Sequence, residues 1–143
     1  MGFTAAALRY SAAMPGPSPP RFRLRDRVGS FRYAIDGLRE TVATQHNARV
    51  HLAATALVVV VAGALRVAAG GWALLAVAIG LVWAAELLNT AIEAAVDLAS
   101  PERHPLAKTA KDAAAAAVLV ASLAAAVVGG CVLGPPLGAL LSD

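Results

Sequence analysis

The sequence contains little charge, and this scarcity narrows its class at once. Only 15% of its 143 residues are Asp, Glu, Lys or Arg, whereas 59% are hydrophobic. A soluble domain of this size needs more charged side chains to cover its surface, so an integral membrane protein is the better interpretation. Apolar and polar residues do not alternate along any segment, which favours membrane helices and argues against a transmembrane barrel.

Cysteine and the common nucleotide-binding motifs are also scarce or missing. Cys131 is the sole cysteine, and one thiol can form neither an internal disulfide nor a Cys-based zinc site. The sequence has no Gly-x-x-x-x-Gly-Lys-Ser/Thr loop and neither the Gly-rich loop nor the His-Arg-Asp loop of protein kinases. Any ATP site must therefore be of another kind.

Positive charge is nearly absent from one stretch between apolar runs. Eight of the 12 Lys and Arg residues precede the first run, three lie between the second and third runs, and Arg66 alone lies between the first and second. This positive-inside pattern predicts a cytoplasmic N-terminus and an outside C-terminus. The pI of about 9.6 could suggest nucleic acid, but this distribution favours anionic lipid, and no nucleic acid partner is expected.

The chain is expected to begin with a disordered basic extension, residues 1–28. The Pro-rich stretch Met14–Pro20 cannot continue a helix, and Arg-rich sequence follows it. The extension weakly resembles a transit peptide, but we favour Met14 as the true initiator.

Residues 29–143 are predicted to form one membrane domain. An amphipathic pattern over about 29–47 is typical of a helix in the cytoplasmic interface. Apolar runs predict spans at about 50–69, 72–99 and 113–133. The expected architecture is an all-α membrane protein with three transmembrane helices plus an N-terminal amphipathic surface helix.

Glycine and proline are expected to separate these spans. Gly70-Gly71 is interpreted as the outer turn, residues 102–112 as a polar cytoplasmic loop, and Gly134-Pro135-Pro136 as the end of the third span. Three thin, Ala-rich helices can hardly enclose a polar site, so a homo-oligomer is expected.

Carboxylates lie on one stripe of the second span. At about 100° per residue, Glu86, Glu93 and Asp97 lie close together in projection and Asn89 lies about 60° aside. A charge in the bilayer centre costs at least about 2.5 kcal/mol, so such residues usually mark a functional site. Helical rise puts Glu86 just inside the cytoplasmic edge and Asp97 in water.

This combination suits phosphoryl transfer. Carboxylates with an amide oxygen suit Mg²⁺, which also takes phosphate oxygens, and Lys111 could neutralise phosphate. A base, a metal and a cation are what this reaction requires. His46 and His51 are interpreted as interfacial or packing residues.

Two segments resemble a known signature. Residues 86–97 (ELLNTAIEAAVD) and 102–112 (ERHPLAKTAKD) are similar to the small prokaryotic diacylglycerol kinases and undecaprenol kinases. The resemblance extends from about Phe31 to Leu133 without gaps. It implies a homotrimer in the bacterial inner membrane that phosphorylates a lipid hydroxyl, with ATP as co-substrate and Mg²⁺ as cofactor.

The resemblance also assigns roles to individual residues. Glu86 matches the catalytic base and Asn89 its polar partner, while Glu93 matches a ligand of metal and nucleotide. The positions that match nucleotide contacts are Tyr33, Glu102, His104, Lys111 and Asp112.

One position departs from the family pattern. Where relatives commonly carry an acidic metal ligand, this chain has Gln45, whose amide oxygen carries no charge. Metal binding at Gln45 is therefore doubtful. The acceptor lipid is left open between diacylglycerol and undecaprenol, and the sequence Asn47–His51 slightly favours the polyprenol.

Non-catalytic alternatives are a cation conduit lined by Glu86 and Asn89, or an inactive regulatory relative. A continuous pore is disfavoured because residues 72–85 offer no polar side chain on the same face.

Overall fold

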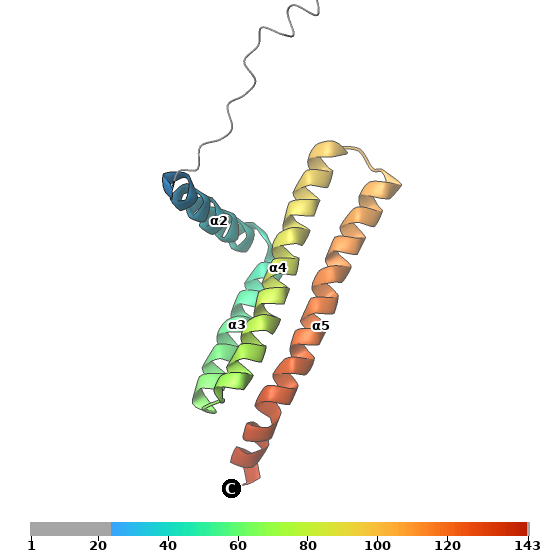
Figure 1. The fold of residues 1–143 in the computed structure, drawn as a ribbon. Coiled ribbons are helices and arrows are strands. Elements are labelled where there is room, and N and C mark those ends of the chain that lie inside the picture. The colour runs from blue at the N-terminus through green and yellow to red at the C-terminus, as the bar shows by residue number, and fades with distance from the viewer. Residues whose placement is uncertain (1–23, 143) are drawn as a thin grey trace, which may run out of the picture. The chain divides into compact units, whose positions relative to one another are not determined.

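The computed structural model describes residues 24–142, and within them the chain forms four helices. They are α2 (Leu24–Thr44), α3 (His46–Ala64), α4 (Ala69–Ala99) and α5 (Pro105–Ser142), labelled in Figure 1. Residues 1–34 and 35–143 form two units. Of the predicted disordered extension, residues 1–23 lie outside the described residues, whereas residues 24–28 are already helical.

Among the described residues, α3, α4 and α5 are each long and apolar enough to cross a membrane. This finding confirms the predicted all-α architecture with three candidate spans. At 1.5 Å per residue, α4 is about 46 Å long and α5 about 57 Å, so both exceed a hydrocarbon core of about 30 Å. Their excess length can carry polar side chains beyond the lipid.

A single extended residue separates α2 from α3. Gln45 has φ −96° and ψ 124°, and its N–H donates to the Thr41 carbonyl at 2.8 Å. The Arg49 guanidinium donates to the carbonyls of Val42, at 3.0 Å, and Ala43. A basic side chain thus satisfies carbonyls that the end of α2 leaves without helical partners. The amphipathic helix therefore ends at Thr44, a few residues before its predicted end.

The turn between α3 and α4 lies earlier than predicted. Val67 N–H donates to Ala62 O at 3.0 Å and Arg66 N–H to Gly63 O at 3.1 Å. This pair of bonds is a Schellman motif, and Arg66 takes its left-handed position with φ 51°. The predicted turn at Gly70-Gly71 is wrong, because both glycines belong to the first turn of α4.

Helix α5 is longer at both ends than the predicted span. It begins at Pro105, so Lys108, Lys111 and Asp112 are helical instead of lying in a loop. It also continues through Pro135 and Pro136, which were expected to stop it. Proline fixes φ near the helical value, but it removes an N–H donor and its ring crowds the carbonyl four residues earlier, so α5 continues there at a cost in stability.

Helix α4 packs mainly against α5 along its length and also contacts α3, as Figure 1 shows. The buried apolar side chains are mostly small, and Ala48, Ala62 and Ala78 are examples. Trp83 Nε1 on α4 donates to Thr55 Oγ1 on α3 at 3.1 Å, which ties these two helices together. Most large apolar side chains face outward, as expected of helices that meet lipid or another chain.

Candidate functional site

The polar residues of α4 pass from buried to exposed along the helix. Glu86 is 1% exposed and Asn89 6% exposed, whereas Glu93 is half-buried and Asp97 is exposed. They recur every three to four residues, which places them on neighbouring turns of one face. The predicted stripe therefore has one end inside the helix bundle and the other in an open environment.

Glu86 lies closest to a histidine of the neighbouring helix. Glu86 Oε2 is 3.9 Å from His51 Nε2 on α3 and accepts no hydrogen bond from any described residue. Thr90 Oγ1 donates to the Glu86 backbone carbonyl at 3.0 Å and so does not satisfy the carboxylate. A buried carboxylate oxygen without a donor is costly, which marks Glu86 Oε2 as a functional rather than a structural group.

Asn89 connects the buried end of the stripe to its open end. Its Nδ2 donates to Glu93 Oε1 at 3.1 Å, one helical turn further along α4. This bond orients the Glu93 carboxylate and leaves its other oxygen available. Asn89 Oδ1 is buried and accepts no hydrogen bond within the described chain. Asn89 thus holds Glu93 in place and keeps a spare acceptor.

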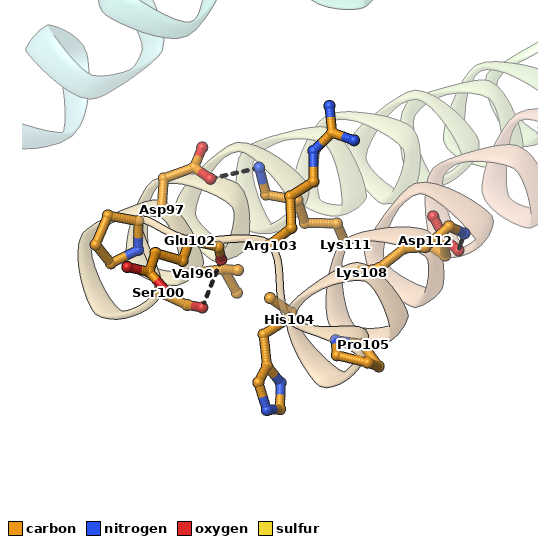
Figure 2. A pocket seen from close by; sticks show the side chains of 12 residues that line it. Val96, Asp97, Ser100, Glu102, Arg103, His104, Pro105, Lys108, Lys111 and Asp112 are labelled. Carbon is orange, nitrogen blue, oxygen red and sulfur yellow. Dashed lines mark hydrogen bonds and ion pairs between the residues drawn. The ribbon is translucent and has the colours of Figure 1, made fainter.

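An open pocket of about 600 Å³ lies where α4 and α5 are joined. Figure 2 shows its side chains, which come from the end of α4, the loop 100–104 and the first turns of α5. The pocket contains four predicted nucleotide contacts, namely Glu102, His104, Lys111 and Asp112. The residues that line it do not include Glu86, Asn89 or Glu93.

Ion pairs place the charged groups of this pocket. Lys111 Nζ is 2.6 Å from Asp97 Oδ1, which joins α5 to α4. Lys108 pairs with Asp112 one turn apart on α5. Figure 2 shows Arg103 on the same side of the pocket as Lys111. The pocket therefore combines three cations with three carboxylates, a set that can receive both phosphate and a divalent cation.

His104 has a structural contact in addition to its place in the pocket. His104 directly precedes α5, which begins at Pro105. The N–H of Leu106, the second residue of α5, donates to His104 Nδ1 at 3.2 Å. His104 therefore acts as the N-cap of α5, and proline at the first helical position needs no such partner. In this state Nδ1 is an acceptor, so Nε2 carries the ring proton and can face the pocket.

The described residues contain no group of three or more His, Cys, Asp or Glu side chains arranged to hold a metal. Glu93 can supply a carboxylate oxygen, and the unpartnered Oδ1 of Asn89 is a hard donor of the kind that Mg²⁺ prefers. Magnesium usually keeps few protein ligands and takes the rest from water and phosphate. The donor set fits a Mg²⁺ that arrives with a nucleotide.

Two predicted site residues lie elsewhere in the chain. Tyr33 belongs to the unit formed by residues 1–34, and its side chain is exposed. Gln45 is half-buried at the break between α2 and α3. Gln45 makes no side-chain cap bond to α3, so its amide oxygen is not needed there.

The sequence interpretation missed the neighbours of three site residues. His51 was interpreted as a packing or interfacial residue, but it approaches Glu86 from 35 positions away along the chain. Asp97 and Lys108 were not assigned as the partners of Lys111 and Asp112. Only the Lys108–Asp112 pair has a sequence signal, because it follows the four-residue helical spacing.

Comparison with known proteins identifies the fold family. The family model described as "Prokaryotic diacylglycerol kinase" matches residues 32–133. The chain belongs to this family. Its relatives in this family include a diacylglycerol kinase of Synechocystis sp., 49% identical over 136 residues that cover 91% of this chain and 78% of the relative.

Two further relatives carry different substrate names. The undecaprenol kinase of Bacillus subtilis (strain 168) is 40% identical over 108 residues, covering 76% of this chain and 88% of the relative. A diacylglycerol kinase of Escherichia coli (strain K12) is 41% identical over 101 residues, covering 71% of this chain and 82% of the relative. As a member of the prokaryotic diacylglycerol kinase family, the chain is a membrane lipid kinase, and a non-catalytic protein is not favoured.

Proposed function

We propose that this lipid kinase transfers the γ-phosphoryl group of ATP to the hydroxyl of a membrane lipid, with Mg²⁺ as cofactor. The observation that carries the proposal is the Glu86 carboxylate, 1% exposed with Oε2 unpartnered within the described chain. A carboxylate in this setting can take a proton from a hydroxyl that reaches it from the lipid. The names of the related kinases supply the acceptor class, either diacylglycerol or undecaprenol.

The stripe on α4 separates the two reactants. Glu86 takes the proton of the lipid hydroxyl, and Asn89 orients Glu93 through the bond at 3.1 Å. Glu93 would hold Mg²⁺, which would supply positive charge to neutralise the phosphates. Catalysis of phosphoryl transfer depends mainly on positioning and charge neutralisation. Along α4, Glu86 comes first and serves the lipid hydroxyl, and Glu93 follows and serves the phosphates.

The pocket at the α4–α5 junction holds the nucleotide. Glu102, His104, Lys111 and Asp112 line it, and Tyr33 is assigned to the same role from the family resemblance alone. Lys111 contributes a point charge for phosphate and is held by Asp97. Gln45 offers a neutral oxygen, so this chain has less acidic charge for metal than relatives with a carboxylate at that position.

We assign the pocket to the cytoplasmic face, with the N-terminus cytoplasmic and the C-terminus outside. The positive-inside distribution supports this orientation, because the segment of residues 101–111, which joins α4 to α5 and includes the first turns of α5, contains Arg103, Lys108 and Lys111. A homotrimer is the proposed assembly. Glu86 and Asn89 keep buried oxygens without donors, and a neighbouring subunit is one source of the groups that complete the site.

Purified full-length protein in detergent micelles tests the proposal. With γ-labelled ATP and Mg²⁺, label is expected in diacylglycerol or undecaprenol, and the preferred lipid identifies the acceptor. Glu86→Gln should lower turnover by about 10²-fold or more, the usual contribution of a general base. Glu40→Gln makes the same change at an exposed position of α2 and should retain activity. Label in neither lipid would refute the proposal.

A further inference from the structure

We propose that His51 is the proton acceptor that regenerates Glu86 after each turnover, an inference that rests on the proposed function. A base that takes the proton of a lipid hydroxyl becomes a neutral acid and must lose that proton before the next cycle. Glu86 is 1% exposed, so water does not reach it directly. The release of this proton therefore needs a neighbouring group.

His51 is placed to be that group. Its Nε2 is 3.9 Å from Glu86 Oε2, the carboxylate oxygen that accepts no hydrogen bond from the described chain. This distance is slightly too long for a hydrogen bond, and a small rotation of either side chain brings it into range. The imidazole side chain is 16% exposed, so it connects the buried carboxylate to a more open environment.

The position of His51 on α3 gives the proton a short way out. His51 lies five residues after His46, where α3 begins and where the side chain of His46 is exposed. At 1.5 Å per residue, this separation is about 7.5 Å along the helix axis. His51 also lines a groove of about 370 Å³ among α3, α4 and α5, and it is the ionisable residue among the described residues that line it.

The proton follows three steps. The lipid O–H proton passes to Glu86 as the lipid oxygen forms its bond to the γ-phosphorus and the bond to ADP breaks. Glu86 then gives this proton to the Nε2 lone pair of neutral His51 and returns to a carboxylate. The imidazolium releases a proton to water, so one proton leaves for each lipid phosphorylated. Histidine suits this role because it exchanges protons near neutral pH.

His51 and Glu86 are needed at different stages of the catalytic cycle, so their loss should have different kinetic effects. Glu86 starts as a carboxylate, so the first phosphoryl transfer does not need His51. His51→Gln keeps a polar side chain of similar length but cannot accept a proton at neutral pH. We expect this variant to form one labelled lipid per site at the wild-type rate and then turn over on the order of 10²-fold more slowly, with KM for ATP unchanged.

Rapid-quench measurement of labelled lipid on the full-length protein, with the preferred lipid in micelles, tests this expectation. Ser122→Ala is the matched control, because it changes another polar side chain of the same groove and should keep wild-type steady-state turnover. His51→Ala leaves space for a small molecule, so added imidazole should restore its steady-state rate. If the Gln variant does not fold, this second measurement tests the proposal instead.

The outcomes separate the inference from the function on which it rests. Loss of the first turnover in His51→Gln, an equally fast steady state in that variant, or no effect of imidazole on His51→Ala would each overturn the relay. A wild-type protein that labels no lipid would instead overturn the proposed function.

Discussion

Lys111 Nζ lies 2.6 Å from Asp97 Oδ1, and this ion pair joins two helices although the residues are 14 positions apart in the sequence. Lys111 comes from the second turn of α5 and Asp97 from the last turns of α4, so the pair closes one side of the pocket at the α4–α5 junction. The side chains are 36% and 66% exposed. Exposed pairs contribute only about 0–1 kcal/mol to stability. The pair therefore matters more for where it holds the ammonium group than for the fold.

The Lys111–Asp97 pair predicts separate effects on nucleotide binding and stability. Lys111→Met should raise KM for ATP by about tenfold to a hundredfold, because a hydrogen bond to a charged group contributes about 1.5–3 kcal/mol. The melting temperature should change little, since the ion pair is exposed. ATP titrations and thermal unfolding in detergent measure both quantities. Asp97→Asn keeps the cation and should change KM less. A large loss of stability with unchanged KM would assign Lys111 to the fold instead.

His104 predicts a stability effect that can be separated from nucleotide binding. His104→Ala removes the acceptor for the Leu106 N–H and should lower the free energy of unfolding by about 1 kcal/mol. His104→Asn should keep this stability, because Asn is a favoured N-cap. If Nε2 contacts ATP, the Asn variant should still show a raised KM. Thermal unfolding and ATP titration of the two variants check this, and equal melting temperatures would contradict the capping role.

Apolar runs predicted the three candidate spans, but Gly and Pro did not mark where the helices end. Arg66 forms the turn between α3 and α4 although Gly is the usual residue in its left-handed position. Gly70-Gly71 has the composition of a turn but is helical. At Pro135 the loss of one N–H does not end α5. Backbone hydrogen bonds end α3 at a residue that is not glycine, and α5 continues past two prolines, so residue composition alone did not locate these ends.

In the functional site, the arrangement within one helix was predictable from the sequence, but the contacts between helices were not. The stripe from Glu86 to Asp97 was predictable because one helix fixes the directions of its own side chains. The approach of His51 to Glu86 depends on how α3 and α4 pack, so helical spacing could not indicate it. Likewise, Asp97 meets Lys111 only because the loop 100–104 returns the chain along α4. Helical periodicity therefore predicted which site residues share a face of α4, but not which residues of other helices contact them.

Gln45 predicts how this chain responds to added charge. Gln45→Glu replaces a neutral amide by a carboxylate at the position where the family resemblance predicts an acidic metal ligand. The Mg²⁺ concentration for half-maximal activity should fall by about tenfold, equivalent to about 1.4 kcal/mol, because Mg²⁺ binds carboxylates more strongly than amides. Magnesium titration of the lipid kinase rate measures this.

The neutral variant Gln45→Ala is the control for the added charge. It should raise the Mg²⁺ requirement if the amide oxygen is a ligand and leave it unchanged if the residue only separates two helices. An unchanged Mg²⁺ requirement in Gln45→Glu would remove position 45 from the metal site.

Gly71 predicts a packing effect that its neighbour Gly70 does not share. A Cβ added at Gly71 would lie 2.5 Å from Val67 Cγ1 and 3.0 Å from Val132 Cγ1, whereas one added at Gly70 meets nothing within 4 Å. Valine is stiff at χ1, so the two side chains cannot rotate away freely. Gly71→Ala should therefore lower the free energy of unfolding by about 1–3 kcal/mol.

Gly70→Ala is the matched substitution, one residue earlier in the same helix turn. It should raise stability by up to about 1 kcal/mol, since alanine is the better helix former. Thermal unfolding of both variants in the same detergent gives the two signs directly. Because Val132 belongs to α5, a destabilised Gly71→Ala would show that this glycine permits the close approach of α4 and α5. Equal stabilisation by both substitutions would mean that the two helices can separate there without cost.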